Sequence, residues 1–194
     1  MDLYKEVIST FAEQFEDAKK SEPSDHNAMT LATAGADAKP HSRVVLLKDF
    51  DDRGFVFYTN LTSHKGQHLR SNPYAALSFH WKSLSRQVHI EGPVSGVSTP
   101  EADAYFASRP RISQIGAWAS LQSQKLNERK TLEERVAEFE AKYKDVAVAR
   151  PPHWSGFRVL PKRIEFWKAG EYRLHHRTVY EYVGAAWTKY LLYP

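Results

Sequence analysis

The densest group of residues that could do chemistry lies between Tyr105 and Trp118, in the run Tyr-Phe-Ala-Ser-Arg-Pro-Arg-Ile-Ser-Gln-Ile-Gly-Ala-Trp. Tyr105 and Arg109 are four residues apart, so they share one face of a helix. Pro110 ends that helix and begins another, which lets Ser113 turn back toward the same place. A phenol, a guanidinium and a hydroxyl that converge at a helix junction suit a phosphate monoester. The alternative is a solvated helix face, but Arg-Pro-Arg inside so aromatic a stretch favours a binding role.

Two further segments carry groups that could hold an anion. Arg43 and Lys48 stand at the two ends of the run Arg-Val-Val-Leu-Leu-Lys, and strand alternation sends them to opposite faces unless a bulge intervenes. Taken alone, both could simply cap a buried strand in solvent. The run Phe-Val-Phe-Tyr-Thr-Asn leads into Ser63, His64 and Lys65, which places hydroxyls at a strand end close to a helix start, a natural anion site. An ordinary strand–helix corner explains that second segment equally well.

Cationic and titratable residues also cluster in the run Arg-Leu-His-His-Arg at residues 173–177. Such groups repel one another unless an anion lies between them, and a histidine there is a candidate acid, base or hydrogen-bond partner. Imidazoles for a metal could come from His64-x-x-x-His68 or from His175 and His176. However, no carboxylate pattern completes such a site, and arginine neighbours oppose a cation. We therefore expect no metal.

Composition narrows the classes of function. A chain of 194 residues, 42% hydrophobic and 13% aromatic, fits one domain with a real core. The formal net charge of +4 is dispersed along the chain, which suits an anionic small molecule better than a nucleic acid. No glycine-rich phosphate loop occurs, so arginine, lysine and hydroxyl side chains must hold any phosphate. Cysteine is absent, and neither a membrane span nor a signal-peptide layout is recognisable. We expect a cytoplasmic protein without membrane or nucleic-acid partners.

Short elements must position these groups. Apolar residues at spacings of three and four predict a helix over Leu3–Lys20, and further helices are expected over Ser63–Arg70 and from Thr99, as the cap, to near Pro110. The capping box Thr131-x-x-Glu134 predicts another. β-rich runs predict strands over Met29–Thr33, Ser42–Lys48, Phe55–Asn60, Ala76–Trp81, Arg86–Val97, Gly156–Leu160, Arg163–Lys168, Thr178–Tyr182 and Trp187–Leu191.

Strands joined by short turns imply an antiparallel sheet, curled into a barrel that protects its edges. No repeat or linker interrupts the chain. We expect one domain over 1–194, with an N-terminal helix (1–20), barrel strands (28–98), a helical segment (99–145) and C-terminal strands (155–194).

Taken together, these segments resemble the pyridoxine/pyridoxamine 5'-phosphate oxidase family from about Ala28 to Arg177. The stretches that match, in the family's order, are Arg43–Lys48, Phe57–Asn60 with Ser63 and Lys65, Ser85–Val88, Tyr105–Trp118, Gln122-Ser123, Glu165–Trp167 and Arg173–His175 with Arg177. The resemblance implies a mainly β (α+β) fold, an antiparallel FMN-binding split β-barrel with peripheral helices. It also implies a homodimer with FMN at the subunit interface.

The resemblance assigns roles to individual residues. Those expected to bind FMN, partly from the second subunit, are Arg43, Val44, Val45, Leu46, Leu47, Lys48, Tyr58, Thr59, Ser63, His64, Lys65, Gln87, Gln122, Ser123, Trp167 and Arg177. Those expected to bind substrate are Lys48, Tyr105, Arg109 and Ser113 at the phosphate, with Arg173, Leu174 and His175 over the pyridine ring. Arg173 and His175 are the candidate catalytic residues. Two departures from the family's usual pattern are His64 in place of an arginine and His176 in place of an aspartate.

The implied reaction oxidises pyridoxamine 5'-phosphate or pyridoxine 5'-phosphate to pyridoxal 5'-phosphate, with hydride transfer from C4' to flavin N5 and O2 as electron acceptor. Two alternatives stay open. The first is a flavin-binding split-barrel oxidoreductase that acts on a different substrate and does not use Tyr105, Arg109 and Ser113. The second is a nonenzymatic binder, either of pyridoxal phosphate or of nucleic acid through its aromatic residues.

Overall fold

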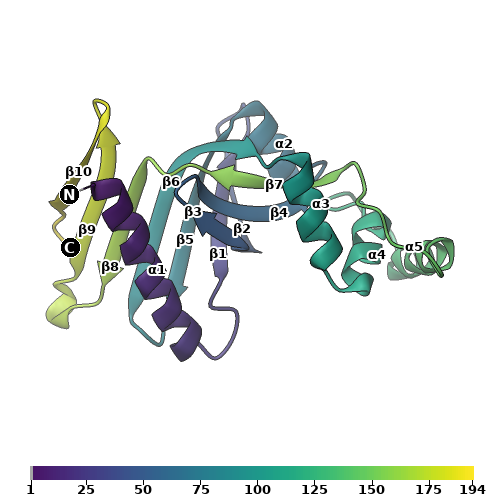
Figure 1. The fold of residues 1–194 in the computed structure, drawn as a ribbon, viewed down its shortest axis with the longest axis horizontal. Helices are drawn as coiled ribbons and strands as arrows, with labels where there is room; N and C mark the ends of the chain where they lie inside the picture. The colour runs from purple at the N-terminus through teal and green to yellow at the C-terminus, as the bar shows by residue number, and fades with distance from the viewer. Residues whose placement is uncertain (1) are drawn as a thin grey trace.

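Ten antiparallel strands form one strongly curled sheet in the computed structural model, which describes residues 2–194 (Figure 1). The strands are β1 (Ala28–Ala34), β2 (Pro40–Leu46), β3 (Asp49–Asp51), β4 (Gly54–Asn60), β5 (Tyr74–Trp81), β6 (Arg86–Gly96), β7 (Trp154–Val159), β8 (Arg163–Lys168), β9 (His176–Val183) and β10 (Ala186–Leu191). The helices are α1 (Leu3–Ser21), α2 (His64–Ser71), α3 (Thr99–Ser108), α4 (Arg111–Ala119) and α5 (Arg129–Lys142), with a 3-10 turn, η1, at Glu171–Arg173.

The long strand β6 produces the curl. Along one edge its first half, Arg86–Glu91, pairs with β8, and its second half, Val94–Gly96, pairs with β7. The sheet therefore divides at β6 into a path β10-β9-β8-β6-β5-β1-β2 and a branch through β7, β4 and β3. The two arms meet again where the Lys48 amide donates a hydrogen bond to the Val56 carbonyl, 2.9 Å away. The expected antiparallel, curled, barrel-like sheet is confirmed.

Helix α1 covers one face of this sheet (Figure 1). Its N-terminus is capped by Asp2, whose side chain accepts hydrogen bonds from two backbone amides. Phe11 is fully buried, and its ring centroid lies 4.9 Å from those of both Phe50 and Phe55. Burying a phenylalanine of this kind contributes about 3 kcal/mol or more to stability. No helix among residues 2–194 combines the length and the apolar character needed to cross a bilayer.

Helices α3, α4 and α5 form a second group at the end of the sheet that carries β4 and β7 (Figure 1). Their core consists of Phe106, Ile115, Tyr143, Val148 and Trp154. As predicted from Pro110, one helix ends at Ser108 and another begins at Arg111. The chain thus turns sharply at Arg109.

Two predicted helix caps are wrong. Helix α3 is capped by Ser98, whose hydroxyl accepts from the Glu101 amide at 3.3 Å, and Thr99 is its first residue. Helix α5 begins at Arg129 and has no side-chain cap, so Thr131 lies inside its first turn instead of preceding it. Sequence patterns fix helix starts only to within a few residues.

The strand predicted over Ser42–Lys48 ends earlier, at Leu46, and the three-residue strand β3 was not predicted. Leu47 turns inward and is buried in the main core. Lys48 therefore lies beyond the strand, and its direction is not set by the alternation that begins at Arg43.

Candidate functional site

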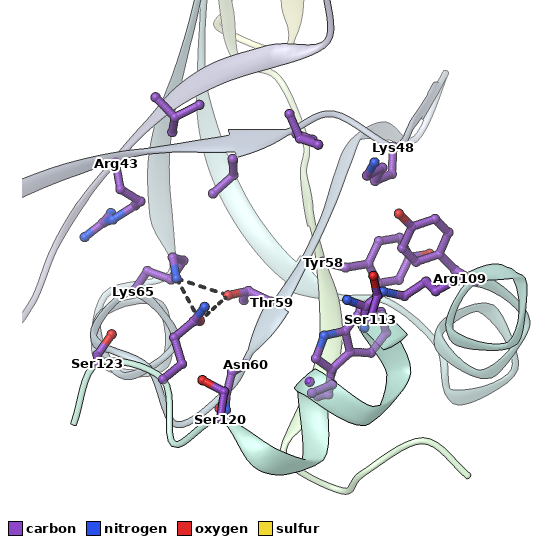
Figure 2. A pocket seen from close by; sticks show the side chains of 18 of the residues that line it. Arg43, Lys48, Tyr58, Thr59, Asn60, Lys65, Arg109, Ser113, Ser120 and Ser123 are labelled. Atoms are coloured by element: carbon purple, nitrogen blue, oxygen red, sulfur yellow. Dashed lines mark hydrogen bonds between the residues drawn. The ribbon is translucent and has the colours of Figure 1, made fainter. Parts of the chain in front are cut away.

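An open cavity of about 1060 Å3 lies between β2, β4, the start of α2 and the α3–α4 junction (Figure 2). Cationic side chains stand at two separate ends of it. Arg43 and Lys65 lie at one end, with Thr59 and Ser123, whereas Lys48 and Arg109 lie at the other (Figure 2). The residues that line the cavity are His41, Ser42, Arg43, Val44, Val45, Leu46, Lys48, Tyr58, Thr59, Asn60, His64, Lys65, Tyr105, Ser108, Arg109, Pro110, Ser113, Gly116, Ala117, Ser120, Gln122, Ser123 and Trp154.

Lys65 is positioned by the turn from β4 into α2. The Ser63 hydroxyl caps α2 by accepting from the Gly66 amide, and it donates to the Asn60 carbonyl at 2.7 Å. Lys65 follows in the first turn, 8% exposed, with its ammonium 3.1 Å from Gln122 Oε1 and 3.2 Å from Thr59 Oγ1. These partners are neutral, so no described residue compensates the positive charge of Lys65.

Burial is the largest influence on the Lys65 ammonium. It lowers the pKa of Lys65 below its usual value, and the nearby Arg43 guanidinium lowers it further. Burial likewise lowers the pKa of Arg43. Two partly desolvated cations at a helix start form a site that a phosphate dianion would stabilise strongly.

Arg109 occupies the opposite end of the cavity. Its guanidinium carbon lies 4.7 Å from the centroid of Trp154 and 5.7 Å from that of Phe106, so aromatic faces fix its plane. Burial lowers the pKa of Arg109. Among the described residues, its Nη1 is the one buried side-chain nitrogen or oxygen without a hydrogen-bond partner. A buried donor without a partner is costly, so this nitrogen is suited to an anionic ligand.

Aromatic rings form the wall next to Arg109. Tyr58 stacks on Tyr105 with centroids 4.0 Å apart and on Trp154 at 5.3 Å. A Cβ at Gly156 would lie 2.8 Å from the Tyr58 ring, so glycine is needed for this packing. Burial, with the nearby carboxylates of Glu101 and Asp49, raises the pKa of Tyr58 to about 12. Tyr58 therefore stays a protonated phenol at neutral pH.

The predicted phosphate group of residues does come together. Tyr105, Arg109 and Ser113 all line the cavity, as the helix junction predicted, and Lys48 joins them. The expectation that Arg43 and Lys48 point to opposite faces is wrong, because both line the same cavity once the strand ends at Leu46.

Most of the predicted flavin residues on β2, β4 and α2 also line the cavity, together with Gln122 and Ser123. Two of this set do not. Leu47 is 3% exposed and belongs to the main core, and Ser63 is fully buried at the start of α2. Because its side chain is in the core, Leu47 can approach a ligand only through its backbone. Ser63 contributes indirectly, by positioning Lys65.

A third predicted group lies elsewhere in the chain. It comprises Gln87, Trp167, Arg173, Leu174, His175 and Arg177, which do not line the cavity. They belong to β6, β8, η1 and β9 and the turn between them. Within one chain, the candidate catalytic pair is therefore not joined to the cavity that holds Lys48 and Arg109.

One member of the charge cluster at residues 173–177, Arg177, is paired with a carboxylate from β8. Glu165, 4% exposed, accepts from Arg177 Nε and from Arg163 Nη2, both at 2.6 Å. Burial opposes ionisation of Glu165, but the hydrogen bonds from Arg177 and Arg163 outweigh it and hold the pKa of that carboxyl below its usual value. Within the cluster, the charge of Arg177 is therefore balanced inside the chain.

The segment around Arg173 is exposed and conformationally strained. Tyr172 and Arg173 both adopt left-handed backbone angles, with φ of 52° and 66°. His175 is held more firmly, because its ring lies 4.6 Å from that of Trp167 and its Nδ1 accepts from the Gly170 amide at 3.3 Å. Strain in an exposed segment is a common feature of residues that contact a ligand or partner.

Sequence reasoning missed several residues of the cavity wall, among them His41, Ser42, Ser108, Ser120 and Trp154. The serines lie at or near element ends, where a hydroxyl can cap as easily as it can bind. Nothing in the sequence pattern indicated that Trp154 lines the cavity, because an aromatic residue at a strand start most often belongs to the core.

Comparisons with known proteins agree with this geometry. A family model described as pyridoxamine 5'-phosphate oxidase matches residues 15–143, and one described as pyridoxine 5'-phosphate oxidase C-terminal dimerisation region matches residues 154–194. A pyridoxine/pyridoxamine 5'-phosphate oxidase of Myxococcus xanthus is 60% identical over 96% of this chain and 91% of its own. The enzyme of that name from Gluconobacter oxydans is 55% identical over 100% of this chain and 97% of its own.

Solved structures show the same fold. PhzG from Burkholderia lata, determined in complex with tetrahydrophenazine-1-carboxylic acid, superposes with a TM-score of 0.92 at 33% identity, covering 97% of this chain and 92% of its own. A pyridoxamine 5'-phosphate oxidase-related, FMN-binding protein from Nostoc punctiforme gives a TM-score of 0.76 at 14% identity, over 96% of each chain.

Proposed function

This chain belongs to the pyridoxine/pyridoxamine 5'-phosphate oxidase family, and we propose that it oxidises pyridoxamine 5'-phosphate and pyridoxine 5'-phosphate to pyridoxal 5'-phosphate. It is an oxidoreductase, and its cofactor is FMN. One observation carries the substrate proposal, namely a single cavity with a buried, unpaired arginine nitrogen at one end and a buried lysine ammonium at the other. Two phosphorylated ring compounds can share such a cavity with their phosphates apart.

The residues present fit FMN at the Lys65 end. Lys65 and Arg43 offer uncompensated positive charge beside the first turn of α2, which suits the phosphate of the cofactor. Backbone groups along β2 and the side chains of Thr59, Gln122 and Ser123 are proposed to contact the rest of the molecule. When bound, FMN supplies the redox chemistry, with a hydride taken up from C4' of the substrate at N5 and the electrons passed on to O2.

The Arg109 end is proposed to bind the substrate phosphate. Arg109 Nη1 lacks a partner in the described structure, and Ser113 and Lys48 can add a hydroxyl and a second cation. Tyr105 is held by stacking on Tyr58, so its phenol can donate from a fixed position. These residues bind and orient the substrate, and such alignment accounts for much of the rate enhancement when a cofactor does the chemistry.

A second subunit is proposed to complete the site. Residues 154–194 match the family's C-terminal dimerisation region, and that region holds Trp167, Arg173, His175 and Arg177, which lie outside the cavity of their own chain. We propose that these residues reach the cavity of the partner subunit, together with Gln87, so that FMN lies at the interface of a homodimer. Arg173 and His175 would then orient the reacting carbon. In this proposal residues 1–194 form a single domain. The cytoplasmic location remains a prediction from the sequence.

A second candidate substrate class comes from the structural comparison. The 33% identical PhzG structure holds tetrahydrophenazine-1-carboxylic acid, so a flavin oxidase of this fold acting on a phenazine precursor is the main alternative. That ligand carries a carboxylate and no phosphate. The unpaired Arg109 nitrogen together with Lys48 and Ser113 favours the phosphorylated substrate.

The proposal is tested by measuring hydrogen peroxide and pyridoxal 5'-phosphate after the FMN-loaded protein is mixed with pyridoxamine 5'-phosphate in air. We expect equal amounts of both products, and much slower turnover of pyridoxamine without its phosphate. Tetrahydrophenazine-1-carboxylic acid serves as the competing substrate. Faster oxidation of that compound than of either phosphorylated B6 compound would contradict the proposal.

A further inference from the structure

Three histidines meet beside the Lys65 end of the cavity. His41 lies on β2, and His64 and His68 lie one helical turn apart on α2. Each offers a ring nitrogen, and these atoms all lie within 4.8 Å of one another. The ring centroids are 4.6 Å apart for His41 and His64, 4.6 Å for His64 and His68, and 5.1 Å for His41 and His68.

We propose that His41, His64 and His68 bind a divalent transition-metal cation of the Zn2+ type. Neutral imidazoles are preferred ligands of such ions, whereas Mg2+ and Ca2+ prefer oxygen. Tetrahedral Zn2+ with bonds of about 2.0–2.1 Å needs ligand atoms about 3.4 Å apart. His41 and His64 are exposed, so small side-chain rotations can bring their nitrogens from the observed spacing to the required one.

The third ligand, His68, is already oriented by a neighbour. It is 8% exposed, and its Nδ1 lies 3.2 Å from the Thr33 hydroxyl oxygen. When His68 donates its Nδ1 proton to that oxygen, Nε2 is left free for a metal, as is usual for metal-binding histidines. The Thr33 oxygen has a second lone pair, which accepts from Arg43 Nη1 at 2.7 Å. One hydroxyl thus orients the imidazole and also binds the nearest guanidinium.

The two cationic side chains nearest the histidines are held by neutral oxygens, and the phosphate of bound FMN is the group proposed to offset their charge. Arg43 is bound to the Leu31 carbonyl at 3.2 Å as well as to Thr33, and Lys65 is bound to Thr59 and Gln122. The carboxylate of Asp37 lies on the same side of the molecule, since its Oδ1 and His68 Nε2 are each 3.5 Å from the point that a Cβ on Gly35 would occupy, but it is not part of the three-histidine group. No metal was expected from the sequence because no carboxylate pattern completed a site with His64 and His68, whereas the fold brings His41 from β2 to them as a third ligand.

The proposed site keeps one position open. His41 and His64 both line the cavity, whereas His68 lies behind them. Three protein ligands leave the fourth tetrahedral position for water or an anionic oxygen from the cavity side. The proposal does not depend on which substrate the enzyme oxidises.

Metal affinity tests the proposal directly. FMN-saturated protein is freed of metal with a chelator and titrated with Zn2+ against a coloured competing chelator. We expect one Zn2+ per chain with a Kd below about 1 µM, and X-ray absorption at the zinc edge showing three imidazole nitrogens. His41→Gln and His64→Gln should each raise the Kd at least about tenfold, because each removes one of three ligands.

His80→Gln is the matched control, because His80 is exposed on β5 and is not part of the cluster. It should leave the Kd unchanged. Equal Kd values for the protein and its His64→Gln variant, or a zinc site with oxygen ligands alone, would overturn the proposal. Zinc binding that appears only after FMN is removed would also overturn it, because the imidazoles would then serve the cofactor phosphate. No outcome depends on turnover, so the proposed oxidase activity can fail or hold independently.

Discussion

At the scale of single residues, the cavity is defined by cations that the chain itself does not neutralise. Arg109 has a buried nitrogen without a partner among residues 2–194, and the Lys65 ammonium is bound to neutral oxygens. Folding brings each of these groups partly out of water without supplying an anion. The free energy that this costs is recovered when a phosphate binds.

Replacing Arg109 tests the substrate end. Arg109→Ala should raise the KM for pyridoxamine 5'-phosphate about 10- to 100-fold, the value of one or two hydrogen bonds to a charged group. The kcat and the bound flavin should change little, because the phosphate is remote from the reacting carbon. Arg129→Ala, at an exposed position on α5, is the control in the same steady-state assay. An unchanged KM would remove Arg109 from the phosphate pocket.

The lowered pKa of Lys65 predicts a pH dependence of flavin binding. The protonated ammonium binds the cofactor phosphate, so the affinity for FMN is full below the pKa of Lys65 and falls as the pH rises through it. Because that pKa is below its usual value in the free protein, the Kd for FMN should rise at a lower pH than ordinary lysine ionisation would allow. Fluorescence titration over pH 7–10 measures it. Lys65→Arg keeps its charge and should show a flatter profile; parallel profiles would refute the role of Lys65.

At the scale of elements, strand and helix ends decide where the functional groups lie. The sequence predicted the break at Pro110 and the strand–helix corner at Ser63 correctly, because proline and capping residues act locally. The sequence did not predict that β2 ends early, at Leu46, or that His41 lies beside α2. Those depend on pairing between strands distant in sequence, which a local pattern does not contain.

The cap of α2 can be tested separately. Ser63→Ala removes the hydroxyl that accepts from Gly66 and donates to the Asn60 carbonyl. The free energy of unfolding should fall by about 1–2 kcal/mol in urea titrations, and flavin affinity should fall with it because Lys65 loses its fixed position. Ser9→Ala, at an exposed site on α1, should do neither. Full stability with weaker flavin binding would mean that Ser63 contacts the cofactor itself.

The link between β8 and β9 predicts a stability change in acid. Glu165 has a lowered pKa in the folded chain, while an unfolded glutamate ionises near pH ~4.3. The stability that ionised Glu165 contributes is therefore complete above that pH. It is lost as the pH falls through the lower pKa that Glu165 has in the folded chain. The Tm of Glu165→Gln should lie below that of the parent at pH 7, and the gap should shrink below about pH 4. A constant gap would show that Glu165 acts without its charge.

At the scale of the whole molecule, the cavity and a second group of predicted residues are separate within one chain, and that second group lies in the matching dimerisation region except for Gln87 on β6. Resemblance identified both groups, yet no sequence pattern reveals which residues cross a subunit boundary. Their separation within the chain supports a site shared between subunits.

Mixed dimers test that division. Arg109→Ala and Arg173→Ala chains, co-expressed with different tags and purified through both, give dimers in which one site carries both defects and the other none. Such dimers should show about half of the parent turnover, because one of two equivalent sites is intact. Either variant alone should be much slower. Mixed dimers that turn over no faster than the two single-variant dimers would mean that both arginines of one chain serve the same site.

A single turnover without oxygen tests whether the bound flavin oxidises pyridoxamine 5'-phosphate. Purified protein with its bound FMN is mixed anaerobically with pyridoxamine 5'-phosphate while the visible spectrum is followed. We expect loss of the oxidised flavin absorption and the formation of one pyridoxal 5'-phosphate per FMN. Flavin that stays oxidised in the presence of both pyridoxamine 5'-phosphate and pyridoxine 5'-phosphate would contradict this expectation.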